Sequence, residues 1–126
     1  MIVAGLGFSS AATVASLRAA FDTAAANHDV AALATVADKE GHSVLTTFAE
    51  ELSLPLHFVA AADLAGQRTL TCSNRSRATY GTGSVAEASA LAAAGKLFGP
   101  GARLLSPRQI SDDRLATCAI AIGGQT

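Results

Sequence analysis

The sequence contains no tryptophan, a single tyrosine and few charged residues, and these shortages exclude some classes of protein. Proteins that bind single-stranded nucleic acid stack bases on aromatic rings and attract the phosphate backbone with a basic surface. This chain has nine basic and ten acidic residues, for a formal net charge of −1, and it offers neither feature. We therefore expect no nucleic-acid partner.

Metal-ligand spacings and long apolar runs are missing as well. The cysteines, Cys72 and Cys118, and the three histidines follow no zinc-ligand spacing, so we predict no metal site. No apolar run reaches the roughly 18 residues that a membrane span needs. The apolar start, residues 1–8, is short and lacks a basic beginning, so we interpret it as a strand and not as a secretory signal. We expect a cytoplasmic protein without a membrane partner.

Alanine and other apolar residues are abundant instead. The 126 residues suit one domain, and a hydrophobic fraction of 50% is enough for one modest core. Alanine is the best helix former, and its small side chain lets helices pack closely. We therefore expect a single domain, residues 1–126.

Short apolar runs alternate with segments of helical periodicity along the chain. Strands are predicted at residues 1–6, 33–37, 56–59, 102–106 and 115–122, with an edge strand at 69–72. Helices are predicted at 11–26, 43–52 and 85–94, with single helical turns at 29–32 and 60–66. The alternation indicates a three-layer αβα sandwich around a mixed, mostly parallel sheet of about five strands. The last two strands are too close in sequence for a helical crossover and should pair antiparallel.

Two glycine-rich turns each precede a predicted helix. The first is residues 5–10, in which Ser9 or Ser10 can cap the helix. The second is residues 81–84, in which Ser84 and Glu87 form a capping box. Free N–H groups at helix starts favour an anion, and ligands of α/β sheets bind beyond the carboxyl ends of the strands. A purely structural interpretation of both turns stays open.

Two further patterns suggest chemistry. Gly5-x-Gly7 after a strand suggests a dinucleotide site, but Ser10 replaces the third glycine, and nucleotide binding is the weaker alternative. Residues 38–42 crowd charged side chains after the second strand, where Lys39 and Glu40 are candidates for acid–base catalysis. From composition alone, a solvated loop is the favoured interpretation of this segment.

The run Gly81-Thr82-Gly83-Ser84-Val85-Ala86-Glu87-Ala88-Ser89-Ala90-Leu91, followed by Ala94-Gly95, resembles the signature of the CobE / CbiG C-terminal domain family. Weaker matches follow in family order at residues 5–7, 39–41, 54–58, 104–108 and 118–122. Many relatives carry Cys-Arg where this chain has Phe8-Ser9, and their charged loop is longer. These departures favour binding over catalysis.

The resemblance implies a protein of cobalamin (vitamin B12) biosynthesis. CbiG-type members, which open a ring-A lactone on a cobalt-precorrin, carry additional N-terminal sequence that is not found here. The expected type is therefore the stand-alone CobE form of the oxygen-dependent route. It is implied to bind a precorrin or corrinoid intermediate such as hydrogenobyrinic acid, as a carrier or processing factor, with no other cofactor. Other cobalamin-pathway enzymes are expected partners, and a CbiG-like precorrin hydrolase is the alternative.

Corrin precursors carry many carboxylates around a flat apolar ring, and the two turns offer groups that fit both parts. Arginine binds carboxylates strongly, and aromatic side chains beside the turns can contact the ring. The expected ligand-binding residues are Gly5, Gly7, Phe8, Ser9, Ser10, Arg75, Arg77, Tyr80, Gly81, Thr82, Gly83 and Ser84.

Overall fold

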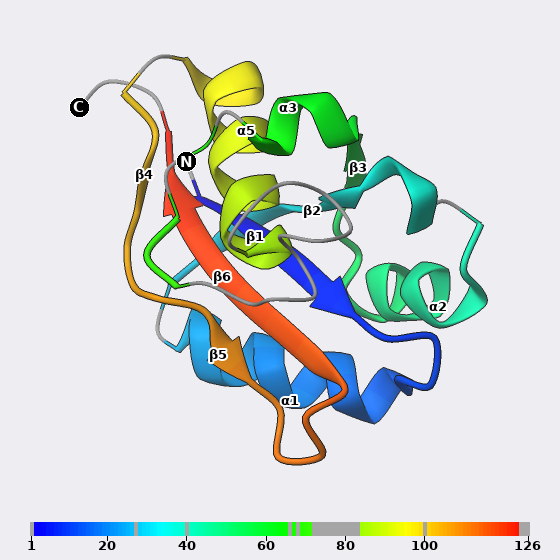
Figure 1. Cartoon of the computed structure of the whole chain (residues 1–126). Coiled ribbons are helices and arrows are strands. Elements are labelled where there is room, and N and C mark those ends of the chain that lie inside the picture. The colour runs from blue at the N-terminus through cyan, green and yellow to red at the C-terminus, as the bar shows by residue number, and fades with distance from the viewer. Residues whose placement is uncertain are drawn as a thin grey trace.

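The computed structural model describes residues 2–26, 28–39, 41–65, 67, 69–71, 84–99 and 101–123 (Figure 1). Its strands are β1 (Ile2–Phe8), β2 (Val30–Val36), β3 (Leu56–Val59), β4 (Arg103–Leu104), β5 (Gln109–Ile110) and β6 (Ala116–Ile122). Its helices are α1 (Val14–Ala25), the 3-10 turn η1 (Ala37–Lys39), α2 (Ser43–Leu52), α3 (Ala61–Ala65) and α5 (Val85–Phe98).

One mixed sheet runs through the molecule in the order β3-β2-β1-β6-β4, and β5 also pairs with β6. β1, β2 and β3 are parallel, as expected for strands that are joined by helical crossovers. β6 lies antiparallel beside β1, from Ile2 opposite Ile122 to Phe8 opposite Ala116. β4 and β5 pair antiparallel with the two halves of β6. The predicted mixed sheet and the antiparallel closing pair are confirmed.

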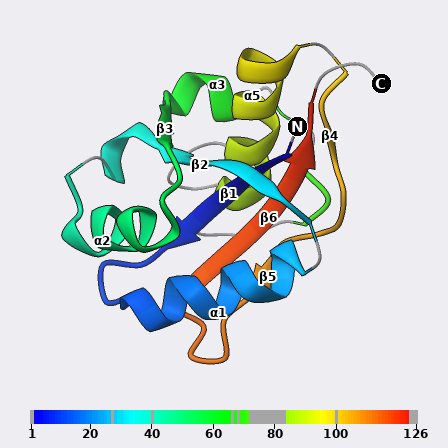
Figure 2. The same cartoon turned by 180° about the vertical axis from the view of Figure 1, so that it is seen from behind.

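Helices cover both faces of the sheet, so the predicted three-layer arrangement is also confirmed. On one face, Leu17 of α1 and Phe48 of α2 pack with Leu6 in a fully buried cluster. On the other face, Leu64 of α3 and Leu91 of α5 pack with the sheet. The two views in Figures 1 and 2 show α1 and α5 on opposite sides of β1 and β6. None of the described helices is long and apolar enough to cross a membrane.

The alanine-rich helix α5 lies unusually close to β1, and Gly5 makes this approach feasible. A Cβ atom built at Gly5 would lie 2.0 Å from the Ala86 carbonyl oxygen and 2.6 Å from the Ala90 nitrogen. Gly123 meets Ala94 one turn further along the helix, where a Cβ would lie 2.5 Å from the Ala94 oxygen. Small residues on both sides therefore bring the helix backbone into contact with the sheet.

The local boundaries differ from the sequence prediction at several points, each for a physical reason. α1 begins at Val14 with Thr13 as N-cap, because Thr13 and Ser16 form a reciprocal capping box that the Ser9 and Ser10 hydroxyls do not offer. α5 passes through Gly95 and ends at Gly99, whose φ of 102° stops the helix.

Two predicted elements are wrong. Residues 30–32 belong to β2 and not to a helical turn, because pairing with β1 overrides the local alanine preference. Residues 69–71 are not a strand, and Cys72 lies outside the described residues.

Replacing Gly5 by Ala is expected to destabilise the fold by about 3 kcal/mol, the upper end of what overpacking costs, because the new methyl group collides with α5 backbone. Gly95→Ala is the matched control, because Gly95 lies in the same helix but away from the contact with β1. Its Cβ would meet only Ala102 at 3.9 Å, so a gain of about 0.5–1 kcal/mol is expected from helix propensity. Urea unfolding of the three proteins measures both values, and equal stability of Gly5→Ala and wild type would contradict the close contact.

Candidate functional site

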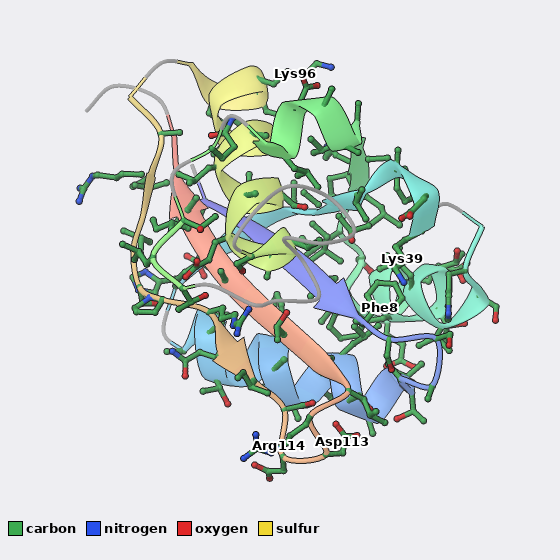
Figure 3. The ribbon with its side chains drawn as sticks, in the orientation of Figure 1. Phe8, Lys39, Lys96, Asp113 and Arg114 are labelled. Carbon is green, nitrogen blue, oxygen red and sulfur yellow. The ribbon has the colours of Figure 1, made fainter. Side chains whose placement is uncertain are left out.

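Three side chains gather where the parallel strands β1 and β2 end. Phe8 is the last residue of β1, Lys39 closes the η1 turn after β2, and His42 precedes α2. The Lys39 Nζ lies 5.1 Å from the centroid of the Phe8 ring, over its face. The His42 ring meets Phe8 edge to face, with centroids 5.1 Å apart and an interplanar angle of 87°. We call these three residues the Phe8 cluster; Figure 3 labels Phe8 and Lys39 side by side.

The local chain geometry explains why the charged loop reaches Phe8. The η1 turn directly follows β2, and the Lys39 carbonyl accepts a hydrogen bond from the His42 N–H at 3.2 Å. Gly41 between them has a φ of 87°, which glycine adopts without steric cost. His42 then serves as N-cap of α2 through its backbone alone. The sequence predicts Phe8 as a ligand-binding residue and Lys39 as a candidate for acid–base catalysis. The fold brings the two side chains together.

His42 carries an unusual polar atom. Its Nδ1 is buried, and in the described part of the chain it has no hydrogen-bond partner. A buried imidazole nitrogen without a partner is uncommon, because burying a polar atom without a hydrogen bond costs free energy.

The predicted turn at residues 5–10 begins in a strand and not in a turn. Gly5 and Gly7 both lie within β1, where Gly5 contacts α5, so they cannot form the phosphate-binding loop that a dinucleotide site needs. Ser9 extends the pairing with β6 by donating its N–H to the Leu115 carbonyl at 2.9 Å. Its hydroxyl accepts the Ala11 N–H at 3.2 Å, so it shapes the loop and does not cap α1. Ser10 is exposed in the same loop.

The start of α1 already holds an internal carboxylate. Asp113, in the turn between β5 and β6, accepts hydroxyl hydrogen bonds from Ser16 and Ser111, both at 2.5 Å. The Leu115 N–H adds a third bond at 3.0 Å. The Ser111 bond, followed by those from Ser16 and Leu115, holds the pKa of Asp113 below its ordinary value of 3.8. Its negative charge lies at the end of α1 that favours anions.

The start of α5 also holds an internal carboxylate, that of Glu87. Ser84 is the N-cap, and its hydroxyl accepts the Glu87 N–H at 3.2 Å, as half of the predicted capping box requires. The Glu87 side chain is fully buried and bonds to other segments of the chain instead of completing the capping box. One oxygen accepts the Leu70 and Thr71 N–H groups at 2.9 and 2.8 Å, and the other accepts the Arg108 N–H at 2.9 Å. The carboxylate lies in the first turn of the helix.

The two helix starts therefore lie at the same edge of the sheet but on opposite faces. α1 follows the end of β1, and Val85 lies beside Gly7, where a Cβ would be 3.6 Å from the Val85 Cβ. Asp113 and Glu87 offset the positive ends of these helices. Two groups that attract anions stay available at this edge: Lys39, whose ammonium lies beside the Phe8 ring, and the start of α2, which has no acidic residue in its first turn.

Several of the predicted site residues lie outside the described residues. These are Arg75, Arg77, Tyr80, Gly81, Thr82 and Gly83, together with the catalytic candidate Glu40. Of the cysteines, Cys118 is buried and unpaired, and burial raises the pKa of its thiol.

Comparison with known proteins assigns the chain to a family. The family model for the cobalamin synthesis G C-terminus matches residues 2–121. The chain therefore belongs to this family of cobalamin-biosynthesis proteins. No curated protein matches it significantly.

Two crystal structures are similar over nearly the whole chain. The first, CobE from the cobalamin (vitamin B12) biosynthetic pathway, has a TM-score of 0.87 and 33% sequence identity, covering 96% of this chain and 92% of that one. The second, cobalamin biosynthesis protein chiG from Agrobacterium tumefaciens strain C58, has a TM-score of 0.69 and 33% identity, covering 99% and 100%. The family predicted from the motif at residues 81–95 is confirmed.

Replacing Asp113 by Asn should lower the stability of the fold more at neutral pH than at pH 3. The folded pKa lies below the unfolded value of 3.8, so the carboxylate stabilises the fold above that pH. The contribution is lost as the pH falls through the folded pKa. Unfolding in urea at pH 7 and at pH 3 measures the two differences. A difference that stays constant between the two pH values would show that the carboxylate charge is not involved.

Proposed function

We propose that this protein binds an acidic corrinoid intermediate of cobalamin biosynthesis, such as hydrogenobyrinic acid. It would act as a carrier or processing factor in the oxygen-dependent route, in the cytoplasm, with other enzymes of the pathway as handover partners. Membership of the cobalamin synthesis G C-terminus family and the similarity to CobE support the pathway.

The observation that carries the proposal is the pairing of Lys39 with the face of Phe8 at the carboxyl edge of β1 and β2. A corrin precursor presents a flat conjugated ring with carboxylates at its rim. A partly buried aromatic ring offers a stacking surface for the first part, and an ammonium group beside it offers a charge for the second. Because a macrocycle would compete with Lys39 for the Phe8 face, we expect the ammonium to move to a carboxylate at the rim when the ring stacks.

His42 supports a second candidate function, hydrolysis of a precorrin ring-A lactone. Its buried Nδ1 has no partner in the described part of the chain, and its ring touches Phe8. In such a reaction the imidazole would take a proton from water as the water oxygen bonds to the lactone carbonyl carbon. The ring C–O bond would then break, and the imidazolium would return the proton to the leaving oxygen, which gives an acid and an alcohol. Mass spectrometry of the bound corrinoid separates the two functions: a carrier returns it unchanged, and a hydrolase returns it with one water added.

Titration with hydrogenobyrinic acid, followed by its visible absorbance, tests the binding proposal. Lys39→Gln should weaken binding about fivefold at low salt, the value of one partly exposed ion pair. It should leave binding of the uncharged methyl ester of the same macrocycle unchanged. Phe8→Leu retains an apolar side chain but removes the aromatic face. It should therefore weaken the binding of both the acid and its methyl ester about fivefold to tenfold.

Lys96→Gln is the matched control, because Lys96 lies in the last turn of α5, far from Phe8 in Figure 3. It loses the same charge and should bind like wild type. If wild-type protein leaves the visible spectrum of hydrogenobyrinic acid unchanged, the binding proposal is wrong. Equal losses of affinity in Lys39→Gln and Lys96→Gln would show that the ligand does not bind at the Phe8 cluster.

A further inference from the structure

Glu87 is a fully buried acid whose partners are backbone and hydroxyl donors from two other segments. Oε1 accepts three bonds, from the N–H groups of Leu70 and Thr71 and from the Thr71 hydroxyl at 3.1 Å. Oε2 accepts the Arg108 N–H at 2.9 Å. We call Leu70, Thr71, Glu87 and Arg108 the Glu87 cluster.

The donors of this cluster form an anion-binding nest that the chain fills with its own carboxylate. Leu70 and Thr71 are consecutive residues whose N–H groups point to one oxygen, which is the arrangement that binds anions in many proteins. Arg108 follows Pro107, which has no N–H, so a single donor of that segment reaches the second oxygen. Burying a carboxylate is costly unless hydrogen bonds satisfy it, and the described residues supply four.

The cluster also lies close to the candidate site. Glu87 is in the first turn of α5, and the backbone nitrogen of Ala86, its neighbour, would lie 3.5 Å from a Cβ at Gly7. Gly7 immediately precedes Phe8. Glu87 thereby ties residues 69–71 and 107–108 to the start of α5, which lies beside this end of β1 on the face opposite the Phe8 cluster. Residues 107–108 directly precede β5, which pairs with β6.

We propose that Glu87 is a positioning residue: its carboxylate is an internal anion that organises residues 69–71 and 107–108 around the start of α5, and so shapes the edge at which the ligand binds. The first part of this inference concerns the protein alone. The second part rests on the proposed corrinoid function.

The pattern of amide hydrogen exchange tests the first part, because different substitutions free different donors. Glu87→Ala should release all three amides, so that Leu70, Thr71 and Arg108 each exchange at least about tenfold faster. Glu87→Gln has one oxygen and one NH₂ group. The oxygen should turn to the three donors of the Leu70 and Thr71 side, so chiefly the Arg108 amide should exchange faster.

Chemical rescue distinguishes a positioning carboxylate from a packing residue. Glu87→Ala leaves a space beside the donors, and added sodium acetate should restore slow exchange of the three amides. Sodium chloride at the same ionic strength should not. Ser89→Ala is the matched control, since Ser89 is fully buried in the same helix and its hydroxyl has no partner in the described part of the chain. It should leave the three amides as in wild type.

Affinity for hydrogenobyrinic acid tests the second part with the same proteins. Glu87→Ala should bind about tenfold more weakly, and acetate should recover most of the loss while leaving wild type unchanged. Unchanged exchange in both Glu87 variants, or rescue by chloride as well as acetate, would overturn the organising role. Faster exchange with unchanged affinity would overturn the positioning role. If wild type fails to bind the corrinoid, the proposed function and the positioning role both fall, while the exchange pattern still decides the organising role.

Discussion

The contact between the backbone of α5 and β1 at Gly5 determines how the rest of the edge is arranged. Because the helix lies so close, its first turn is placed beside Gly7, and Glu87 points toward residues 69–71 and 107–108. A larger residue on either surface would lift the helix and move that turn. The small side chains of α5 thus do more than favour the helix. They also determine how close the Glu87 carboxylate lies to the sheet.

The electrostatics of this edge differ from those expected for an anion receptor built on helix ends. Two of the helices that begin here, α1 and α5, are each paired with a carboxylate of the same chain, Asp113 at α1 and Glu87 at α5. An acidic ligand gains less from a helix end whose partial charge is already offset. In the proposed site, the Lys39 ammonium and the start of α2, which has no acidic residue in its first turn, would then be the groups that attract the ligand's carboxylates.

Much of the fold could be predicted from periodicity, since α2, β3 and the order of layers all follow local patterns. The misplaced features depend on distant partners. Gly5 and Gly7 suggested a turn because a glycine required by a distant contact, with α5 at Gly5 and with Thr117 at Gly7, looks the same in sequence as one required by local backbone. Likewise, Glu87 follows Ser84 at capping-box spacing, and nothing local indicates that Leu70 and Arg108 engage its side chain instead. The juxtaposition of Phe8 and Lys39 needed the parallel pairing of β1 and β2.

The position of β6 has a consequence for how the molecule assembles during synthesis. This strand is the last of those described along the chain, yet it lies inside the sheet, between β1 on one side and β4 and β5 on the other. Until it leaves the ribosome, β1 exposes an unpaired edge, and α1 and α5 lack much of the surface that they cover. A nascent chain that ends before β6 is therefore an unfinished half-sheet with an exposed strand edge, and the sheet is completed only once β6 has been synthesised.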